Sequence, residues 1–355
     1  MDATAKTLMF DMSAGSDIYD DELGRNMSKS EVNETIRNIC FEELGITEKS
    51  TEKQIKRALH SDKALALNEV IEEVIETKIQ YGLAEDDFYN KYVETRNLAD
   101  GDRNEFWVDD DIILTVSKVS GDHHQLSMQR LSAGNSYNIP TAMYGIKVGD
   151  NLRMFLTGRK DWNSFVDAAA KAYLNKIQTL ISAEFATGTS LIPIPSNLTG
   201  NGPLTPSTPG TPGTDVAFNA IIEKVEAANN CPAVIMGTKT ALKNLNDICD
   251  VDWLSLGQKD AFANTGIIGM YQGTELYALP QKFADKTLTT PIVNNRKLWI
   301  MPQLDDRFIK LIDGGEVELT INEVGGTMDD LQSYELQRRI GVGTLMSRYH
   351  GEWTV

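Results

Sequence analysis

The sequence predicts an α+β protein with a helical N-terminal region, a long two-stranded excursion, one long helix and a compact mixed domain. Apolar residues recur at steps of three and four over 161–187, which indicates one face of a long helix. Strand-forming residues collect after Gly101, and a helix–strand–helix order follows residue 215. These patterns together favour the α+β class.

Helical patterns dominate the first part of the chain. Residues 1–28 are polar and are expected to form an extended arm, after which Ser30 can cap a first helix. Further helices are predicted at 51–60, 62–79 and 86–98. We therefore expect a largely helical N-terminal arm over residues 1–97.

Residues 98–150 read as an extended two-stranded loop. Strand formers continue to Val119, a polar tip follows at His123 and His124, and a return strand is predicted through 126–131. The chain is expected to rejoin the body near Met154. An isolated hairpin is marginally stable by itself, so we expect a neighbouring subunit to support it.

The long helix is predicted over 161–187, with Asp161 as its N-cap and Gly188 as its C-cap. At about 1.5 Å per residue it would be roughly 40 Å long, which suits a structural spine. The next segment, 190–214, is rich in proline, glycine, serine and threonine and is interpreted as a linker or surface loop.

Helix and strand signals alternate in the C-terminal half. A helix is predicted at 216–228, a buried strand at 233–236, and a second helix after Thr238, which can cap it. Further strands are predicted at 267–271, 275–279, 298–301, 307–312 and 316–322. Residues 328–340 are expected to be helical at first, and a last extended run closes the chain at 343–353.

Composition narrows the function classes. The formal net charge of −17 repels phosphates and disfavours a DNA-binding role. The three cysteines are odd in number and unpaired in spacing, so a disulfide framework or zinc ribbon is not expected and a reducing compartment fits. With no export signal and no apolar run near 20 residues, we expect no membrane association.

No metal-binding or catalytic motif is present with the residue spacing that it requires. Asp109–Asp111 with Glu105 lack the EF-hand order, and His123 and His124 lack a ligand partner nearby in sequence. For Cys231 a buried thiol is favoured over a catalytic nucleophile. The GxSxG and Walker motifs are absent from the sequence. We predict no enzyme activity, no catalytic residue, no cofactor and no metal.

Segments in the C-terminal third carry a family resemblance. They are GMYQGTELYALP at 269–280, LWIMP at 298–302, YELQRRIGVG at 334–343 and YHGEWT at 349–354. With the element order above, they resemble the major capsid proteins of tailed bacteriophages, whose fold is named after phage Hong Kong 97.

The resemblance implies a division of the chain. The expected parts are an N-terminal arm (1–97), an extended loop (98–150), a peripheral domain with the spine helix (151–189), a Pro/Gly-rich insertion (190–214), an axial domain (215–320) and a return to the peripheral domain (321–355). Some members lose an N-terminal scaffolding domain to a protease, whereas here we expect the arm to be retained. Some members also bond a loop lysine to an asparagine, but no asparagine follows Asn322.

The resemblance also implies the function and the partners. The chain would self-assemble as hexamers and pentamers into an icosahedral head that encloses phage double-stranded DNA without sequence-specific binding. A portal protein would occupy one vertex, with scaffolding and decoration proteins as further partners. The chain would be located in the virion capsid and assembled in the bacterial host cytoplasm.

Contacts between subunits are expected in the extended loop, which is too thin to bury its aromatic residues within one chain. Aromatic and arginine residues are frequent interface anchors, and arginines there could pair with acids of a neighbour. The candidates are Arg103, Phe106, Trp107, Lys118, Arg130 and Tyr137. The alternative is that these side chains fold back onto their own body.

Two other functions stay open from the sequence. An encapsulin-like compartment shell would share the fold and hold enzyme cargo in place of DNA. An α+β hydrolase or transferase would use the domain at 215–320 and would require a pocket of convergent polar groups. Genomic neighbours and oligomeric state distinguish these alternatives from a phage capsid subunit.

Overall fold

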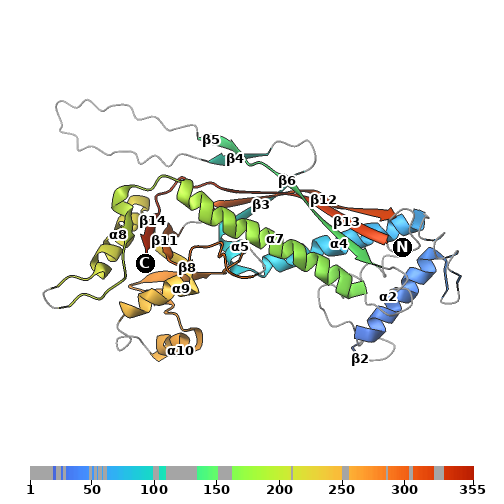
Figure 1. Cartoon of the computed structure of the whole chain (residues 1–355), viewed down its shortest axis with the longest axis horizontal. Helices are drawn as coiled ribbons and strands as arrows, with labels where there is room; N and C mark the ends of the chain where they lie inside the picture. Colours follow the sequence, from blue (N-terminus) through green and yellow to red (C-terminus); the bar gives the residue numbers. More distant parts are fainter. Residues whose placement is uncertain are drawn as a thin grey trace, which may run out of the picture.

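The computed structural model shows an elongated α+β molecule, which confirms the predicted class (Figure 1). The residues that the structure describes are 19–20, 25–26, 29–47, 50–51, 54, 58, 62–98, 104–108, 134–150, 162–208, 211–249, 256–284, 287–303, 307–323 and 332–355.

The helices occupy five main stretches of the described chain and several short turns. They are α2 (Lys29–Leu44), α4 (Asp62–Ala84), α5 (Asp87–Tyr92), α7 (Trp162–Leu191), η1 (Ser196–Leu198), α8 (Thr214–Asn229), α9 (Lys239–Lys243), η2 (Asn244–Asp247) and α10 (Leu256–Thr265). The strands are β1 (Tyr19–Asp20), β2 (Arg25–Asn26), β3 (Val93–Leu98), β4 (Glu105–Val108), β5 (Asn135–Asn138), β6 (Ala142–Asp150), β7 (Thr199–Asn201), β8 (Ala233–Thr238), β9 (Met270–Tyr271), β10 (Thr274–Leu279), β11 (Lys297–Pro302), β12 (Ile309–Glu323), β13 (Gln332–Thr344) and β14 (Gly351–Thr354).

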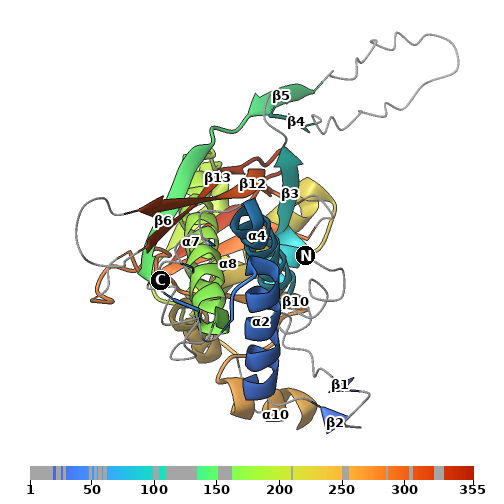
Figure 2. The same ribbon diagram turned by 90° about the vertical axis from the view of Figure 1, so that its right-hand side faces the viewer.

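Two sheets organise the molecule. A four-stranded sheet of order β3-β12-β13-β6 extends along the long axis, with α4 and α7 against one of its faces (Figures 1 and 2). A six-stranded sheet of order β7-β14-β11-β8-β10-β9 forms the other end, together with α8 and α9. The C-terminal strand β14 therefore lies in the second sheet, although β13 lies in the first.

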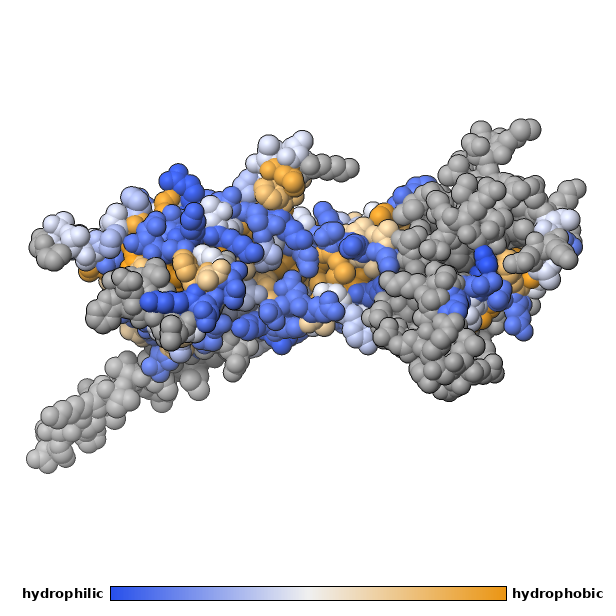
Figure 3. Space-filling model, turned by 90° about the horizontal axis from the view of Figure 1, so that it is seen from below, coloured by the Kyte–Doolittle hydropathy of each residue, from blue (hydrophilic) through white to orange (hydrophobic). Residues whose placement is uncertain are grey.

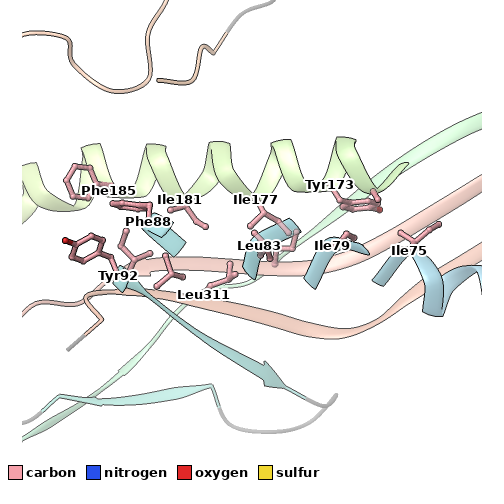
Figure 4. Packing of buried hydrophobic residues seen from close by; sticks show 14 of the residues in the cluster. Ile75, Ile79, Leu83, Phe88, Tyr92, Tyr173, Ile177, Ile181, Phe185 and Leu311 are labelled. Carbon is pink, nitrogen blue, oxygen red and sulfur yellow. The ribbon is translucent and has the colours of Figure 1, made fainter. Parts of the chain in front are cut away.

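The spine helix α7 packs along α4 and the first sheet. Tyr173, Ile177, Ile181 and Phe185 repeat every four residues and are buried against α4, α5 and β12 (Figure 4). The Tyr173 hydroxyl also donates a hydrogen bond of 2.5 Å to the Leu336 carbonyl of β13. The predicted apolar stripe is confirmed over the part of it that the structure describes, and it joins the N-terminal helices to the main core.

The second sheet is buried on both faces, which explains the unbroken apolar runs in its central strands. Successive residues of β8 point to opposite sides: Ile235 packs under α8 and α9, whereas Met236 packs toward α7 and α5. In β11, Leu298 and Trp299 divide in the same way. Thr238 caps α9 as predicted, because its hydroxyl accepts a hydrogen bond from the Ala241 amide at 3.3 Å.

Two predicted helical segments are wrong because they pair as strands. The expected helix at 86–98 ends at Tyr92, after which β3 pairs in parallel with β12. The expected helical start of 328–340 falls partly outside the described residues, and from Gln332 the chain is the strand β13. In β13, Leu336, Arg338 and Ile340 alternate with exposed residues, which is the period of a strand.

The proposed boundaries also change at two points. The predicted linker 190–214 contains β7, which pairs with β14, and its Leu198 and Leu204 are buried. Strand β12 begins at Ile309 in the first sheet, so the predicted compact domain 215–320 is too long. The predicted hairpin strands at 112–119 and 126–131 and the second helix at 51–60 fall wholly or largely outside the described residues.

A buried arginine joins the helical arm to the first sheet. The side chain of Arg338 is 0% exposed, and its Nε donates to Asp313 Oδ1 at 2.6 Å. Its Nη2 donates to the other Asp313 oxygen and lies 3.9 Å from Glu76 Oε1 of α4. This guanidinium therefore connects β13, β12 and α4 at one point.

Gly188 is inside α7 and not at its predicted C-cap, because the helix continues to Leu191. A Cβ at Gly188 would lie 2.5 Å from Thr344 Oγ1 and 2.6 Å from Thr344 Cβ. The glycine therefore permits close contact between α7 and the end of β13. This contact also accounts for a glycine inside a helix, where alanine is normally favoured by about 1 kcal/mol.

We expect Gly188→Ala to lower the free energy of unfolding by about 1–3 kcal/mol, since the added methyl group overpacks the contact with Thr344. The matched control is Gly82→Ala in α4, whose Cβ would meet the end of the flexible Leu174 side chain (Cδ1 at 2.5 Å, Cδ2 at 3.1 Å), which can move aside, so its effect should be near zero. Urea unfolding of both variants measures the difference. A Gly188→Ala protein more stable than the parent would contradict this explanation of the glycine.

Candidate assembly site

The base of the extended loop is a two-stranded ribbon fixed to the first sheet. Strands β4 and β5 pair antiparallel, with Phe106 opposite Tyr137 and Trp107 opposite Ser136. Figure 2 shows the ribbon on the side of the sheet away from α4 and α7. We call β4, β5 and the residues that hold them the hairpin root.

Phe106 anchors the hairpin root. Its side chain is 1% exposed and packs with Ile139 and with Ile312 of β12, whose neighbour Leu311 faces the helices instead. The guanidinium carbon of Arg96 lies 4.2 Å from the centre of the Phe106 ring, a cation–π contact. The expectation that Phe106 contacts another subunit is corrected, because the ring folds back onto its own chain.

Polar contacts reinforce the anchor. Arg96 Nη1 donates to the Glu105 carbonyl at 2.9 Å, and Asn104 Nδ2 donates to the Ile139 carbonyl. The buried Lys310 ammonium binds Glu94 at 2.6 Å. Burial alone would raise the pKa of Glu94, but the bonds and charges of Lys310 and Arg96 hold that pKa below its ordinary value. The ribbon is thus held by packing and by charge-assisted hydrogen bonds.

Aromatic side chains are exposed on the same ribbon. Trp107 is 59% exposed and Tyr137 is 44% exposed, and their positions in the ladder place them on opposite faces. Trp107 also lies against Gly134, where a Cβ would be 2.8 Å from the indole Nε1. Gly134 has a φ of +69°, so its turn and this contact both favour glycine.

A cavity of about 410 Å³ lies beside the hairpin root. Its lining residues are Val108, Tyr137, Ile192, Thr344, Leu345, Met346 and Ser347. None of these side chains carries a formal charge at neutral pH. The hollow therefore offers an uncharged contact surface on a strongly acidic chain.

The structure brings together only part of the predicted contact set. Trp107 and Tyr137 share the hairpin root, whereas Arg103, Lys118 and Arg130 lie outside the described residues. Sequence reasoning missed Arg96 and Lys310, which hold Phe106, because their role depends on strands paired from distant parts of the chain. Among the described residues, no group of acidic, histidine or cysteine side chains could hold a metal ion, and no helix is long and apolar enough to cross a bilayer.

The opposite side of the molecule looks different. Seen from below, the described surface is mainly hydrophilic, with small and separate hydrophobic areas (Figure 3). Monomeric proteins commonly show scattered apolar residues of this kind. The hairpin root, with its two exposed aromatic side chains and the uncharged hollow lined by Tyr137, is therefore the stronger candidate for a protein contact.

Family comparison decides the class of protein. Residues 13–354 match the model of a family described as "SPbeta prophage-derived putative capsid protein YonB". The chain belongs to this capsid protein family. The match covers nearly the whole sequence, so the resemblance to phage capsid proteins is confirmed at the level of the family. No curated protein matches significantly.

Solved capsids show distant likenesses. The mature capsid of bacteriophage PhiM1 gives a TM-score of 0.48 at 10% identity, covering 76% of this chain and 87% of that one. The capsid of cyanophage P-SCSP1u gives 0.46 at 13% identity, covering 75% and 87%. A virus-like particle from Pyrococcus furiosus gives 0.40 at 14% identity, covering 79% and 97%.

Proposed function

We propose that this chain is the major capsid protein of a tailed phage and assembles as hexamers and pentamers into an icosahedral head around double-stranded DNA. Membership of a prophage capsid family supports a shell subunit. The observation that carries the mechanism is the hairpin root, which is fixed to the body at Phe106, exposes Trp107 on one face and places Tyr137 of the other face beside an uncharged hollow.

The mechanism follows from rigidity and repetition. A ribbon held by Phe106 and Arg96 presents its exposed side chains in a fixed direction, which lowers the entropy that ordering would otherwise cost on association. Many weak contacts of this kind, repeated around a closed shell, give collective stability. Arg103, Trp107, Lys118, Arg130 and Tyr137 are the proposed contacts with neighbouring copies.

The proposed partners follow from the same function. A portal protein would occupy one vertex, scaffolding or decoration proteins would bind the shell during or after assembly, and packaged DNA would lie inside. The net charge of −17 favours a wall that does not hold DNA tightly. The shell would be built in the bacterial host cytoplasm and remain as the capsid of the virion.

Size exclusion and negative-stain microscopy of the full chain, alone and with its neighbouring genes, test the proposal. We expect closed shells, rings of five or six, or curved sheets. A monomer under every condition would overturn the proposal, and shells that enclose an enzyme in place of DNA would favour the encapsulin-like alternative.

A point substitution tests the hairpin root as the contact. We expect Trp107→Ser to reduce the assembled fraction at least tenfold, since truncating an aromatic residue at the centre of an interface commonly costs about 2 kcal/mol of binding free energy. Tyr81→Ser is the matched control, because Tyr81 of α4 is 60% exposed and Trp107 is 59% exposed. Equal assembly of both variants and the parent would contradict a contact at Trp107.

A further inference from the structure

A buried histidine lies where the spine helix meets the second sheet. His350 directly precedes β14 and is 2% exposed. It hydrogen-bonds the backbone of Thr189 in the last turn of α7, and its Nε2 is buried without a hydrogen-bond partner. The imidazole therefore joins a helix of the first core to a strand of the second.

The backbone on both sides of His350 is fixed. The Tyr349 amide donates to Asn229 Oδ1 at 3.1 Å, and the Asn229 side chain donates to the Tyr349 carbonyl at 2.8 Å. Gly351 pairs with Ile300 in the sheet, and a Cβ there would lie 2.8 Å from Ile221 Cγ2 of α8. The backbone that carries the ring is thus held to α8 and within β14, and the buried ring itself is bonded to α7.

Two charged groups act on the ring. Glu352, two residues along β14, attracts the protonated imidazole, whereas Lys297 of β11 repels it. Lys297 Nζ binds Glu352 Oε2 at 2.9 Å and balances part of the carboxylate charge, while Oε1 is buried without a hydrogen-bond partner. The group of α7 that contacts the ring is the Thr189 backbone, which is uncharged. The nearby residue of α8, Asn229, is also uncharged.

We propose that His350 is an acid-sensitive latch that holds the C-terminal turn of α7 against the second sheet while its ring is neutral. A proton on Nε2 would place a cation on a buried nitrogen that has no hydrogen-bond partner. The junction then opens to hydrate the charge. The latch acts within one chain, whatever that chain assembles into.

The direction of the pH effect follows from proton linkage. Burial, named first, lowers the pKa of His350 from its ordinary value of 6.5, and Glu352 only partly opposes this. Below pH 6.5 His350 is therefore protonated in the unfolded chain but still neutral in the folded chain. The folding equilibrium constant should fall about tenfold per pH unit until the pH reaches the folded pKa.

The test compares thermal unfolding of the full chain and His350→Asn between pH 8 and pH 5. Asparagine can still donate to the Thr189 carbonyl but does not titrate. We expect the parent midpoint to fall more on acidification than the variant midpoint, by at least about 2 °C. Equal falls would overturn the proposal, because every other group titrates alike in both proteins.

A second measurement covers the case in which the variant fails to fold. Hydrogen–deuterium exchange at the imidazole C2 position, read by mass spectrometry on the peptide that contains His350, gives its pKa in the intact parent. A value below 6.5, lowered further by Glu352→Gln, supports the latch. A value at or above 6.5 would overturn it.

Discussion

Replacing Asp313 with alanine is expected to lower the free energy of unfolding by about 3–5 kcal/mol, since it leaves a buried guanidinium without its main partner. Arg338 is 0% exposed along its side chain, and Nη1 has no hydrogen-bond partner even in the parent. Glu76, at 3.9 Å and 30% exposed, compensates little. Chemical denaturation monitored by far-ultraviolet circular dichroism measures the loss.

A double substitution separates charge from packing. Arg338→Met with Asp313→Leu removes both buried charges and keeps apolar bulk, so we expect a stability within about 1 kcal/mol of the parent. Glu34→Gln breaks a partly exposed ion pair with Arg37, 3.8 Å apart, in which the Glu34 side chain is 65% exposed, and should change stability by less than about 0.5 kcal/mol. A double variant as unstable as Asp313→Ala alone would show that shape, and not the unpaired charge, is responsible.

The same arginine shows what sequence patterns can and cannot predict. The apolar stripe on α7 and the buried strand β8 are predictable because both patterns are local in sequence. In α7 the apolar residues recur every three or four positions, and in β8 every residue is buried because helices cover both faces of the sheet. Arg338 occurs in a segment expected to begin as a helix. Its burial depends on Asp313 and Glu76, which lie 25 and 262 residues away in the sequence.

Burial at the hairpin root likewise depends on residues that are distant in the sequence. The sequence correctly indicated that aromatic residues gather near Phe106, but it could not distinguish the buried ring from the exposed Trp107 beside it. That distinction depends on parallel pairing between β3 and β12, which brings Arg96 beside Ile312. Because the sequence predicts a helix where β3 lies, the contact of Arg96 with Phe106 is not predictable from local patterns.

Phe106→Ala is expected to release the hairpin root from the sheet. Truncating a buried phenylalanine costs about 3–5 kcal/mol in a core, and here the loss falls on a small cluster formed with Ile139 and Ile312. The cation–π contact with Arg96, at 4.2 Å, is lost as well. We therefore expect local opening of β4 and β5 more than global unfolding.

Amide hydrogen exchange tests this directly. Amides of 105–108 and 135–138 should exchange at least about 100-fold faster in Phe106→Ala, while those of β8 stay protected. Phe106→Leu, which keeps apolar bulk, should retain most of the protection.

Assembly gives the functional consequence of this anchor. If the root must be rigid to present Trp107, then Phe106→Ala should abolish shells even though Trp107 itself is intact. Trp107→Ser should reduce the assembled fraction at least tenfold without speeding exchange at 105–106 and 137–138. Normal shells from a Phe106→Ala protein with a mobile root would separate anchoring from assembly and would place the necessary contacts elsewhere in the loop.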